Sequence, residues 1–475
     1  MPEAIPQEAK QYDLVVIGGG PAGVSAADTA ADLHKSVALI DSNHELGGAG
    51  INTGTVPSKT LRETALALSG IKSRALYGVD LSLRREVTVP DFLRHELSVK
   101  SGFNTLISKR LEAEQATIYF GRGKFIDPHT FRVEPQEGGE SILLRGEHIL
   151  IATGSAPVHP PLFPFGTPGV YDSDTILKLD RIPKRMAVIG AGVIGAEYGC
   201  TFAALGTEVH IIDGRETLLS FLDGEVSRAL ASALEGTGVR FHWKETVKEC
   251  QTGAAGGLTL QFASGAALEV DAVLVAAGRK SNTDDLGLEI AGVATEKRGL
   301  IPVNENYQTK VEHIYAAGDV IGFPALASTS MAQSRLAVQH MFGVTSGHFS
   351  SLLPNGIYTI PEVSMVGETE ESLKKQGVDY VVGRGWYDKN ARGRIIGDST
   401  GFLKLIYRRD GMKLVGVHVM GELATEIVHI GLMGMLSDRA ADIFIDACFN
   451  IPTLSLLYKT ATLDALKNAA APVPA

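Results

Sequence analysis

The sequence predicts an α/β protein with two doubly wound dinucleotide-binding domains and a further C-terminal α+β domain. Two copies of one order of elements carry the first part of this prediction: a strand, a glycine turn, a helix, and a second strand that ends in an acid. The turns are GGGPAG at residues 18–23 and GAGVIG at residues 190–195. Asp41 and Asp213 each follow the first glycine of their turn by 23 positions (18 to 41 and 190 to 213). From about residue 347 the pattern changes to strands followed by helices, which indicates a third domain.

The first turn has the residues that a dinucleotide needs. Gly18 is expected to make the tight turn, Gly20 to let the backbone approach a pyrophosphate, and Gly23 to let the helix pack on the strand. The helix would present its positive end to the phosphates, and Asp41 is placed to accept ribose hydroxyls. The alternative is a packing turn with a surface Asp. The complete order of strand, turn, helix and acid favours nucleotide binding.

The second turn predicts a nicotinamide nucleotide site in the same way. Its candidate residues are Gly190, Gly192, Val193 and Gly195. A carboxylate at Asp213 would accept a 2′-hydroxyl and repel a 2′-phosphate, which favours NADH without excluding NADPH. Arg215 could meet such a phosphate, although a solvated surface arginine is the simpler interpretation.

Further elements follow from the apolar pattern of the chain. We expect helices over residues 55–76, opened by Pro57-Ser58, and over residues 91–114. The other expected elements are strands ending near residue 152, at 270–277, 401–408 and 414–420, and helices from residue 424 onward.

Composition and charge exclude several classes of function. A formal charge of −10 without clustered basic residues argues against nucleic acid and anionic membranes as partners. The three cysteines have no C-x-x-C spacing, so we expect no metal site and no disulfide scaffold, but small, mostly buried apolar residues in a reducing compartment. The N-terminus is polar, and no apolar run reaches the length of a membrane span. We therefore expect a cytoplasmic protein.

Residues 47–59 (GGAGINTGTVPSK) resemble the active-site helix of the flavin disulfide reductases, the pyridine nucleotide-disulfide oxidoreductase family. Residues 152–154 (ATG), 278–279 (GR) and 317–320 (AGDV) are similar to further motifs of that family, in the same order. The resemblance covers essentially the whole chain. It implies FAD and NAD(P) as cofactor and substrate, and a homodimer or higher homo-oligomer.

The resemblance also implies domain boundaries and further site residues. The FAD-binding domain would comprise residues 1–152 and 279–346, the NAD(P)-binding domain residues 153–278, and the dimerisation domain residues 347–475. The implied FAD residues are Gly48, Thr55, Thr153, Gly154, Asp319 and Ala327, and Gly278 is implied for NAD(P). Residues 327–329 would begin a helix that faces the flavin, although a Ser N-cap explains them equally well.

The departures from the family pattern remove one reaction. The two cysteines of the disulfide reductases align with Gly50 and Thr55, and their C-terminal His and Glu align with Ile451 and Leu456. A dithiol relay cannot operate without thiols. The sequence therefore excludes disulfide reduction by that relay.

The groups for hydride exchange are retained. By the resemblance, Lys59 would lie near flavin N5 and Glu197 would pair with it, whereas the simpler alternative for Glu197 is an acid on the helix surface. Among family members without the cysteine pair, the chain is similar to the soluble, Si-specific pyridine nucleotide transhydrogenases. The segments that carry this similarity are residues 55–59, 170–177, 215–223, 356–362 and 448–453.

The leading functional prediction is ping-pong transhydrogenation, in which NAD(P)H reduces the flavin and an oxidised nucleotide then takes the hydride. An NAD(P)H:quinone or dye reductase is the enzymatic alternative. It would use the space left by Gly50, Thr55, Ile451 and Leu456. A non-catalytic flavin-binding sensor or subunit is the alternative of another class, and the retained Lys59 and Glu197 argue against it.

Overall fold

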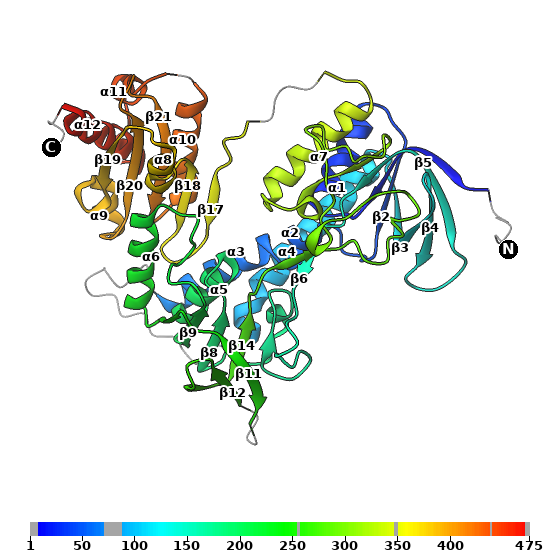
Figure 1. The fold of residues 1–475 in the computed structure, drawn as a ribbon, viewed down its shortest axis with the longest axis horizontal. Coiled ribbons are helices and arrows are strands. Elements are labelled where there is room, and N and C mark those ends of the chain that lie inside the picture. Colours follow the sequence, from blue (N-terminus) through cyan, green and yellow to red (C-terminus); the bar gives the residue numbers. More distant parts are fainter. Residues whose placement is uncertain (1–7, 71–87, 254–256, 346–349, 438, 471–475) are drawn as a thin grey trace. The chain divides into compact units, whose positions relative to one another are not determined.

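The computed structural model describes residues 8–70, 88–253, 257–345, 350–437 and 439–470 (Figure 1). The chain divides into two compact units. The first unit comprises Met1–Thr60, Leu93–Val158 and Ala277–Phe349, and the second comprises Leu61–Phe92, His159–Ala276 and Ser350–Ala475. We describe each unit by itself.

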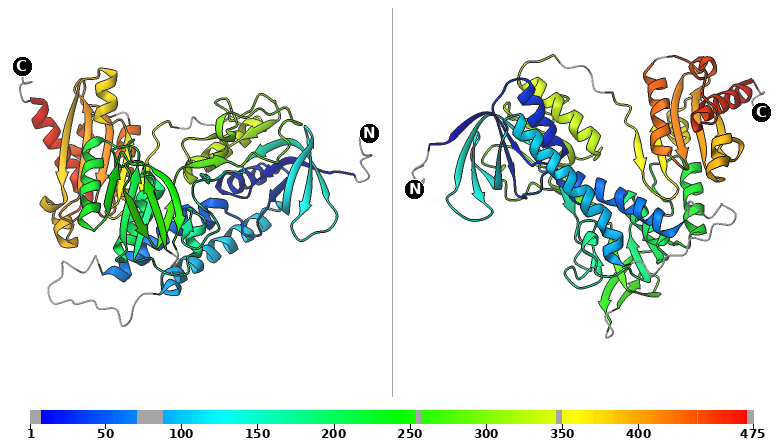
Figure 2. Two further views of the ribbon diagram at one scale, coloured as in Figure 1. Left: turned by 60° about the horizontal axis from the view of Figure 1, so that its bottom comes forward. Right: turned by 180° about the vertical axis from the view of Figure 1, so that it is seen from behind.

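The first unit is built on a six-stranded sheet. Its strands are β1 (Lys10–Ile17), β2 (Val37–Asp41), β3 (Thr117–Asp127), β4 (Thr130–Pro135), β5 (Ile142–Ile151) and β16 (Ile314–Ala316). The core strand β1 is parallel to both β2 and β5, and β4 joins β3 to β5 by antiparallel pairing. Helices α1 (Pro21–Asp32) and α7 (Ala327–Met341) pack against each other, as both views in Figure 2 show. Their apolar faces bury Ala26, Ala30 and Ala337 against the sheet.

The second unit contains a parallel sheet in the order β10 (Arg240–Trp243), β9 (Glu208–Asp213), β8 (Arg185–Ile189), β14 (Ala272–Val275) and β7 (Val170–Tyr171). Helices α5 (Val193–Ala204) and α6 (Gly224–Gly236) follow β8 and β9 along the chain. A three-stranded antiparallel sheet adds β11 (Val247–Thr252), β12 (Leu258–Phe262) and β13 (Ala267–Val270).

The strand predicted over residues 270–277 is wrong, because two strands share that range. β13 ends at Val270 and β14 begins at Ala272. Between them, the Asp271 carboxylate accepts the backbone N–H groups of Lys184 and Arg185 at 3.0 and 2.9 Å. These bonds fix the point where the chain leaves the antiparallel sheet and enters the parallel one.

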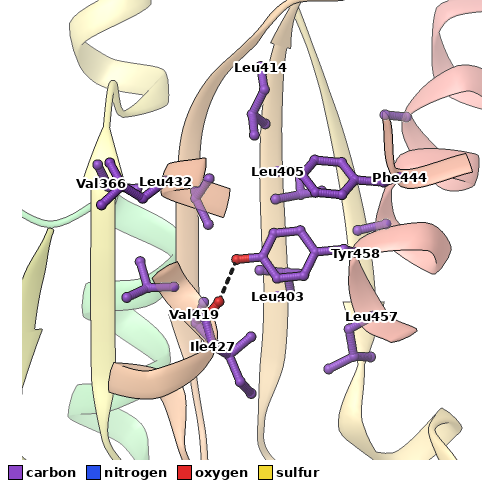
Figure 3. Close-up of a cluster of buried hydrophobic side chains, with 14 of the residues drawn as sticks. Val366, Leu403, Leu405, Leu414, Val419, Ile427, Leu432, Phe444, Leu457 and Tyr458 are labelled. Atoms are coloured by element: carbon purple, nitrogen blue, oxygen red, sulfur yellow. Dashed lines mark hydrogen bonds between the residues drawn. The ribbon is translucent and has the colours of Figure 1, made fainter. Parts of the chain in front are cut away.

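The C-terminal part of the second unit is an α+β domain. Its antiparallel sheet has the order β17 (Asn355–Ile357), β18 (Val363–Gly367), β21 (Leu414–Met420), β20 (Phe402–Arg408) and β19 (Tyr380–Trp386). The helices are α8 (Glu370–Gln376), α9 (Ala391–Ile396), α10 (Ala424–Leu436), α11 (Asp442–Asp446) and α12 (Leu457–Ala470). Figure 3 shows the core between them, where the Tyr458 hydroxyl donates to the Ile427 carbonyl at 2.9 Å. The predicted strands at 401–408 and 414–420 are present within one residue of their limits.

Two helices follow the glycine-rich segment after β2. α2 (Gly48–Asn52) is short, and α3 (Thr55–Ser69) begins where the sequence predicts, two residues before Pro57. Among the described residues, α3 ends at Ser69, and Gly70 adopts the positive φ of 63° that commonly follows a helix end. The predicted end at residue 76 lies outside the described part of the chain. α4 (Val89–Ala113) agrees closely with the expected range of 91–114.

Two short strands complete the fold, β6 (Ser155–Pro157) and β15 (Arg279–Ser281), which pair antiparallel in the first unit. No helix among the described residues is long and apolar enough to cross a membrane.

Candidate functional site

The two glycine turns have nearly the same geometry. Gly18 and Gly190 adopt φ angles of 102° and 110°, which are accessible to glycine and strained for other residues. A Cβ added at Gly18 would lie 2.3 Å from the Ala152 carbonyl oxygen, and one at Gly190 would lie 2.6 Å from the Ala276 carbonyl oxygen. Each turn therefore presses against the end of a neighbouring strand, and only glycine fits there.

The third glycine of each turn closes the contact between turn and helix. A Cβ at Gly23 would lie 1.8 Å from the Gly18 carbonyl oxygen, and one at Gly195 would lie 1.9 Å from that of Gly190. These positions have the packing role that the sequence predicts.

The middle glycines are open. The nearest atom to a Cβ at Gly20 is 3.8 Å away, and a Cβ at Gly192 would meet nothing within 4 Å. Gly20 and Gly192 are the N-cap residues of α1 and α5, and Val193 is the first residue of α5. Neither N-cap residue provides a side-chain hydrogen bond to the first turn of its helix, and the space beside each middle glycine is open. This is a cradle of the kind that binds a pyrophosphate.

An acid stands beside each turn. The Asp41 carboxylate accepts the Gly19 N–H at 2.6 Å, and the Asp213 carboxylate accepts the Ala191 N–H at 2.7 Å. Asp41 is part-buried and its second oxygen accepts the Asn43 N–H at 2.7 Å. Burial raises the pKa of Asp41 above its ordinary value in spite of these donors. Both acids are held where the sequence places the ribose.

Asp213 differs from Asp41 in having an arginine partner. Arg215 donates from Nε to Oδ1 at 2.9 Å and from Nη2 to Oδ2 at 2.7 Å. Burial opposes ionisation of Asp213, but the hydrogen bonds from Arg215 and Ala191 outweigh it and lower its pKa to about 2. Arg215 is exposed, as the simpler interpretation of a surface arginine expects, and its guanidinium is in addition bound to Asp213.

The predicted flavin-site residues lie in the first unit. Gly48 adopts a φ of 52°, and a Cβ there would lie 2.8 Å from the Gly20 Cα, so the backbones of the two segments meet. Thr55, the first residue of α3, is exposed. Lys59 is part-buried one turn further along, with its Nζ 3.2 Å from the Ser58 hydroxyl.

Asp319 is held by Ser155, which the sequence did not indicate, together with Arg279 of the motif at residues 278–279. The Ser155 hydroxyl donates to Asp319 Oδ2 at 2.7 Å, and Arg279 Nε donates to that hydroxyl at 2.8 Å. Thr153 lies two residues before β6, and its hydroxyl donates to the Asn282 carbonyl at 2.7 Å. The neighbouring Gly154 accepts the Asn282 N–H through its carbonyl at 2.9 Å.

Ala327 is the first residue of α7, as the resemblance implies. The N-cap residue is Leu326, and it provides no side-chain hydrogen bond. The alternative of a Ser N-cap is therefore wrong, because Ser328 lies inside the helix. Gln333 on the same helix accepts the Gly318 N–H at 2.9 Å and holds the segment before Asp319.

Glu197 is buried in α5, with 5% of its surface exposed, so the alternative of a surface acid is wrong. Its Oε1 accepts the backbone N–H of Tyr358 at 2.9 Å. The segment around Tyr358 is fixed in turn by Arg62, which donates to the Thr359 carbonyl at 3.0 Å and lies 3.1 Å from a Glu362 oxygen. No sequence motif indicated this support, because its parts come from distant segments.

Gly278 lies in the first unit, where its carbonyl accepts the Val158 N–H at 3.0 Å. The other predicted NAD(P) residues and Glu197 lie in the second unit, and the other predicted FAD residues and Lys59 lie in the first.

The positions of the family's thiols and histidine hold Gly50, Thr55 and Ile451 in this chain. A Cβ at Gly50 would lie 2.7 Å from Cγ of Pro21. Ile451, at the position of the histidine, is 74% exposed in this single chain. Cys200 and Cys250 are buried and Cys448 is exposed, which agrees with the expectation of mostly buried cysteines.

Among the described residues, one cluster of three carboxylates has the spacing of a metal site. Its oxygens, from Asp223, Glu225 and Glu370, lie within 4.8 Å of one another. The buried ammonium of Lys404 lies among them, 2.7 Å from Asp223 and 2.9 Å from Glu225. Lys404 therefore already supplies a cation to this cluster.

Known proteins share this architecture. The family model described as pyridine nucleotide-disulphide oxidoreductase matches residues 12–334, and that of the corresponding dimerisation domain matches residues 353–462. A protein of Mycobacterium tuberculosis (strain ATCC 25177 / H37Ra) called soluble pyridine nucleotide transhydrogenase is 45% identical over 459 residues, 97% of this chain and 98% of the relative. A protein of Marinomonas sp. (strain MWYL1) with the same name is 40% identical over 96% of this chain and 98% of its own.

A solved structure agrees with these matches. The HOCl-induced flavoprotein disulfide reductase RclA from Escherichia coli superposes with a TM-score of 0.86 at 28% identity, over 95% of this chain and 99% of its own. The predicted fold class of two dinucleotide-binding domains and a dimerisation domain is confirmed. The chain belongs to the pyridine nucleotide-disulphide oxidoreductase family.

Proposed function

We propose that this protein is a flavin-dependent transhydrogenase, which moves hydride between NAD(P)H and NAD(P)+ in a ping-pong reaction. The chain uses FAD, with nicotinamide nucleotides as substrates, and its dimerisation domain makes it a homo-oligomer. One observation carries the proposal: both nucleotide turns are intact, with matched acids and open middle glycines, while Gly50 and Thr55 replace the thiols of a disulfide reductase. The named relatives favour this reaction over quinone reduction.

The first turn fits the cofactor. Gly18, Gly20 and Gly23 leave the backbone space that a pyrophosphate requires, and we assign Asp41 to its ribose and Asp319 to the ribityl chain. Bound FAD supplies the hydride-accepting chemistry. The second turn, with Gly190, Gly192, Val193, Gly195 and Asp213, is assigned to each nicotinamide nucleotide in turn. We retain the predicted domain boundaries, and the roles of Gly48, Thr55, Thr153, Gly154, Ala327 and Gly278, as parts of this proposal.

Lys59 and Glu197 are proposed to act electrostatically. A positive charge at Lys59 would favour hydride acceptance by the flavin, because the reduced ring carries negative charge. Glu197 is buried and held by the Tyr358 N–H, so its position is fixed before substrate binds. Hydride transfer needs no side-chain acid or base, which is consistent with Ile451 and Leu456 at the positions of the family's His and Glu.

The test is direct hydride transfer between nucleotides. Purified enzyme with FAD bound is mixed with NADPH and thio-NAD, and formation of thio-NADH is followed. The proposal expects turnover, with a parallel-line pattern in double-reciprocal plots. No turnover, while NADH still bleaches the flavin, would show that the proposal is wrong. Menadione as the acceptor in parallel assays measures any quinone reductase activity.

Two finer features belong to the same proposal. We propose transfer of the pro-S hydrogen of the nicotinamide, in keeping with the similarity to Si-specific transhydrogenases. Stereospecifically deuterated NADH tests this, and retention of a pro-S label in the oxidised product would overturn it.

We also place the enzyme in the cytoplasm, where the three free cysteines would remain reduced. Cell fractionation with an antibody to the protein tests that location.

A further inference from the structure

Arg62 is a buried arginine whose guanidinium has partners in three directions. The residue lies in α3 and is 4% exposed. Its Nε donates to the Thr359 carbonyl at 3.0 Å, and its Nη2 lies 3.1 Å from Glu362 Oε1. Its Nη1 donates to the carboxylate of the neighbouring Glu63. A buried charge is tolerated when it is paired and hydrogen-bonded, so these partners fix the guanidinium in one orientation.

The guanidinium holds a short segment of the second unit, residues 358–362, at two points. Thr359 is completely buried, and its hydroxyl donates to the Pro361 carbonyl at 2.6 Å. At the end of the segment, Glu362 Oε2 accepts the hydroxyl and the N–H of Thr425 at 3.0 and 3.3 Å, in the first turn of α10. Arg62 therefore ties the segment to α3, and Glu362 ties it to α10.

The beginning of this segment meets Glu197. The Tyr358 N–H donates to Glu197 Oε1 at 2.9 Å, and Glu197 is buried in α5. Thr359, whose carbonyl Arg62 holds, is the next residue along the chain. A shift of that carbonyl would therefore move the donor that meets the Glu197 carboxylate.

The helix that carries Arg62 also carries the other charge assigned to hydride exchange. Lys59 lies three residues before Arg62 in α3, and residues at this spacing share one face of a helix. A charge acts most strongly on a reaction when its position is fixed beforehand. α3 thus provides Lys59 directly, and it holds the donor to Glu197 through Arg62.

We propose that Arg62 is a positioning residue for hydride transfer, which acts on the Glu197 carboxylate through the Tyr358 N–H. The guanidinium fixes the Thr359 carbonyl and Glu362, and these fix where Tyr358 presents its N–H. Without Arg62, the Glu197 carboxylate loses a donor of fixed position. This inference rests on the proposed function, because it requires that Glu197 influences hydride transfer. A purely structural ion pair would instead stabilise the second unit alone.

The test is a double-mutant cycle on flavin reduction by NADH, followed by stopped-flow absorbance with FAD bound. Arg62→Lys keeps the charge, but lysine lacks the planar group that binds a carbonyl and a carboxylate together. It is expected to lower the limiting rate constant about tenfold, with less than about a twofold change in the NADH concentration at half saturation. In a Glu197→Gln background, the same substitution is expected to change the rate constant by less than about twofold, because the group through which it acts is already altered.

Hydrogen exchange gives a second readout that does not depend on turnover. Mass spectrometry of the peptide that contains Tyr358 is expected to show faster amide exchange in Arg62→Lys than in the unaltered holoenzyme, because the segment is held less firmly. Glu362→Gln weakens the same contacts and keeps the shape of the side chain. It is expected to change both readouts in the same direction, and it replaces Arg62→Lys in the cycle if that variant does not retain FAD.

Arg384→Lys is the matched control. Arg384 also forms two side-chain hydrogen bonds in the second unit, from Nε and Nη2 to the two oxygens of Glu225, both at 2.8 Å. Its substitution is expected to leave flavin reduction unchanged.

Equal losses of rate from Arg62→Lys with and without Glu197→Gln, or no loss in either background, would overturn the inference. An unaltered rate in Glu197→Gln alone would also overturn it. Failure of the unaltered enzyme to reduce thio-NAD, while NADH still reduces its flavin, would overturn the proposed function and not the role of Arg62.

Discussion

Lys404 and Asp223 form an ion pair in which both side chains are completely buried, with 2.7 Å between Nζ and Oδ1. Asp223 is the N-cap residue of α6, and Lys404 lies in β20 of the antiparallel sheet. The same ammonium contacts Glu225 and Glu370 at 2.9 and 2.5 Å. One buried lysine therefore joins the nucleotide-binding part of the second unit to its C-terminal domain.

Replacing Lys404 with methionine is expected to destabilise the second unit by about 3–5 kcal/mol, because three carboxylates would lose their shared cation. Chemical denaturation of the holoenzyme, followed by circular dichroism, measures this loss. Lys374→Met is the control. The Lys374 ammonium also approaches Glu370, at 3.8 Å, but its side chain is largely exposed. This substitution is expected to cost less than about 1 kcal/mol. Similar losses in the two variants would contradict the prediction.

The same cluster predicts a dependence of stability on pH. Burial opposes ionisation of Asp223, Glu225 and Glu370, but hydrogen bonds from Lys404, and from Arg384 to Glu225, lower the pKa of all three carboxyls. Carboxyls with a lowered pKa stabilise the fold at pH values above their ordinary pKa of about 4. That stability is lost as pH falls through the pKa of the folded state.

The sign is opposite at the lysine. Burial lowers the Lys404 pKa, but the carboxylates outweigh burial and raise it. The stability that Lys404 contributes is present at pH values below the ordinary lysine pKa of about 10.4, and it is lost as pH rises through the pKa of the folded state. We expect the difference in denaturation midpoint between the unaltered protein and Lys404→Met to be constant at neutral pH and to shrink at both extremes. A difference that grows below about pH 4 would contradict this assignment.

Asp28 on α1 predicts a different pH response. Burial of Asp28 and the neighbouring Glu114 carboxylate raise the Asp28 pKa to about 7, although the Arg110 guanidinium lies 2.6 Å from Asp28 and opposes this shift. The folded protein thus keeps a proton that the unfolded chain releases near its ordinary pKa of about 4. Stability contributed by Asp28 is therefore lost as pH rises from about 4 to about 7, and changes little above that.

Asp28→Asn removes this titration. Relative to the unaltered protein, the variant is expected to gain about 1–3 kcal/mol between about pH 5 and pH 8, measured by denaturant unfolding. Glu114→Gln should produce a smaller change of the same sign, because it removes the neighbouring carboxylate. Parallel stability curves for Asp28→Asn and the unaltered protein would show that Asp28 titrates normally.

The sequence predicted the two nucleotide turns because each is a local feature. The glycines 18 and 190, their helices and the acids 41 and 213 lie within one short segment each, so spacing alone indicated their arrangement. Lys404 could not be predicted in this way, since it lies in β20 and its partners come from the beginning of α6 and the start of α8. The fork between Arg215 and Asp213 depends on a side-chain conformation that spacing does not determine. Asp271 shows the same limit for strands. The apolar pattern on both sides of it predicted one strand, but hydrogen bonds from the distant Lys184 and Arg185 N–H groups to Asp271 separate β13 from β14.

The last prediction separates the packing role from the binding role within one turn. Gly195→Ala would place a methyl group 1.9 Å from the Gly190 carbonyl oxygen, which is rigid backbone. It is expected to destabilise the second unit by about 2 kcal/mol or more, because either the turn or α5 must shift. Gly192→Ala meets no atom within 4 Å and has an ordinary φ of −84°, so it is expected to fold normally.

Gly192→Ala should instead weaken 5′-AMP and NADH, because its methyl group would fill the space where phosphate approaches the backbone. Calorimetry and thermal unfolding of both variants separate the two effects. Gly236→Ala, at the end of α6 with nothing within 4 Å of its Cβ, is the control for adding a methyl group. If Gly192→Ala lost stability but bound both ligands normally, the middle glycine would serve packing, and the open cradle at the start of α5 would not be a phosphate site.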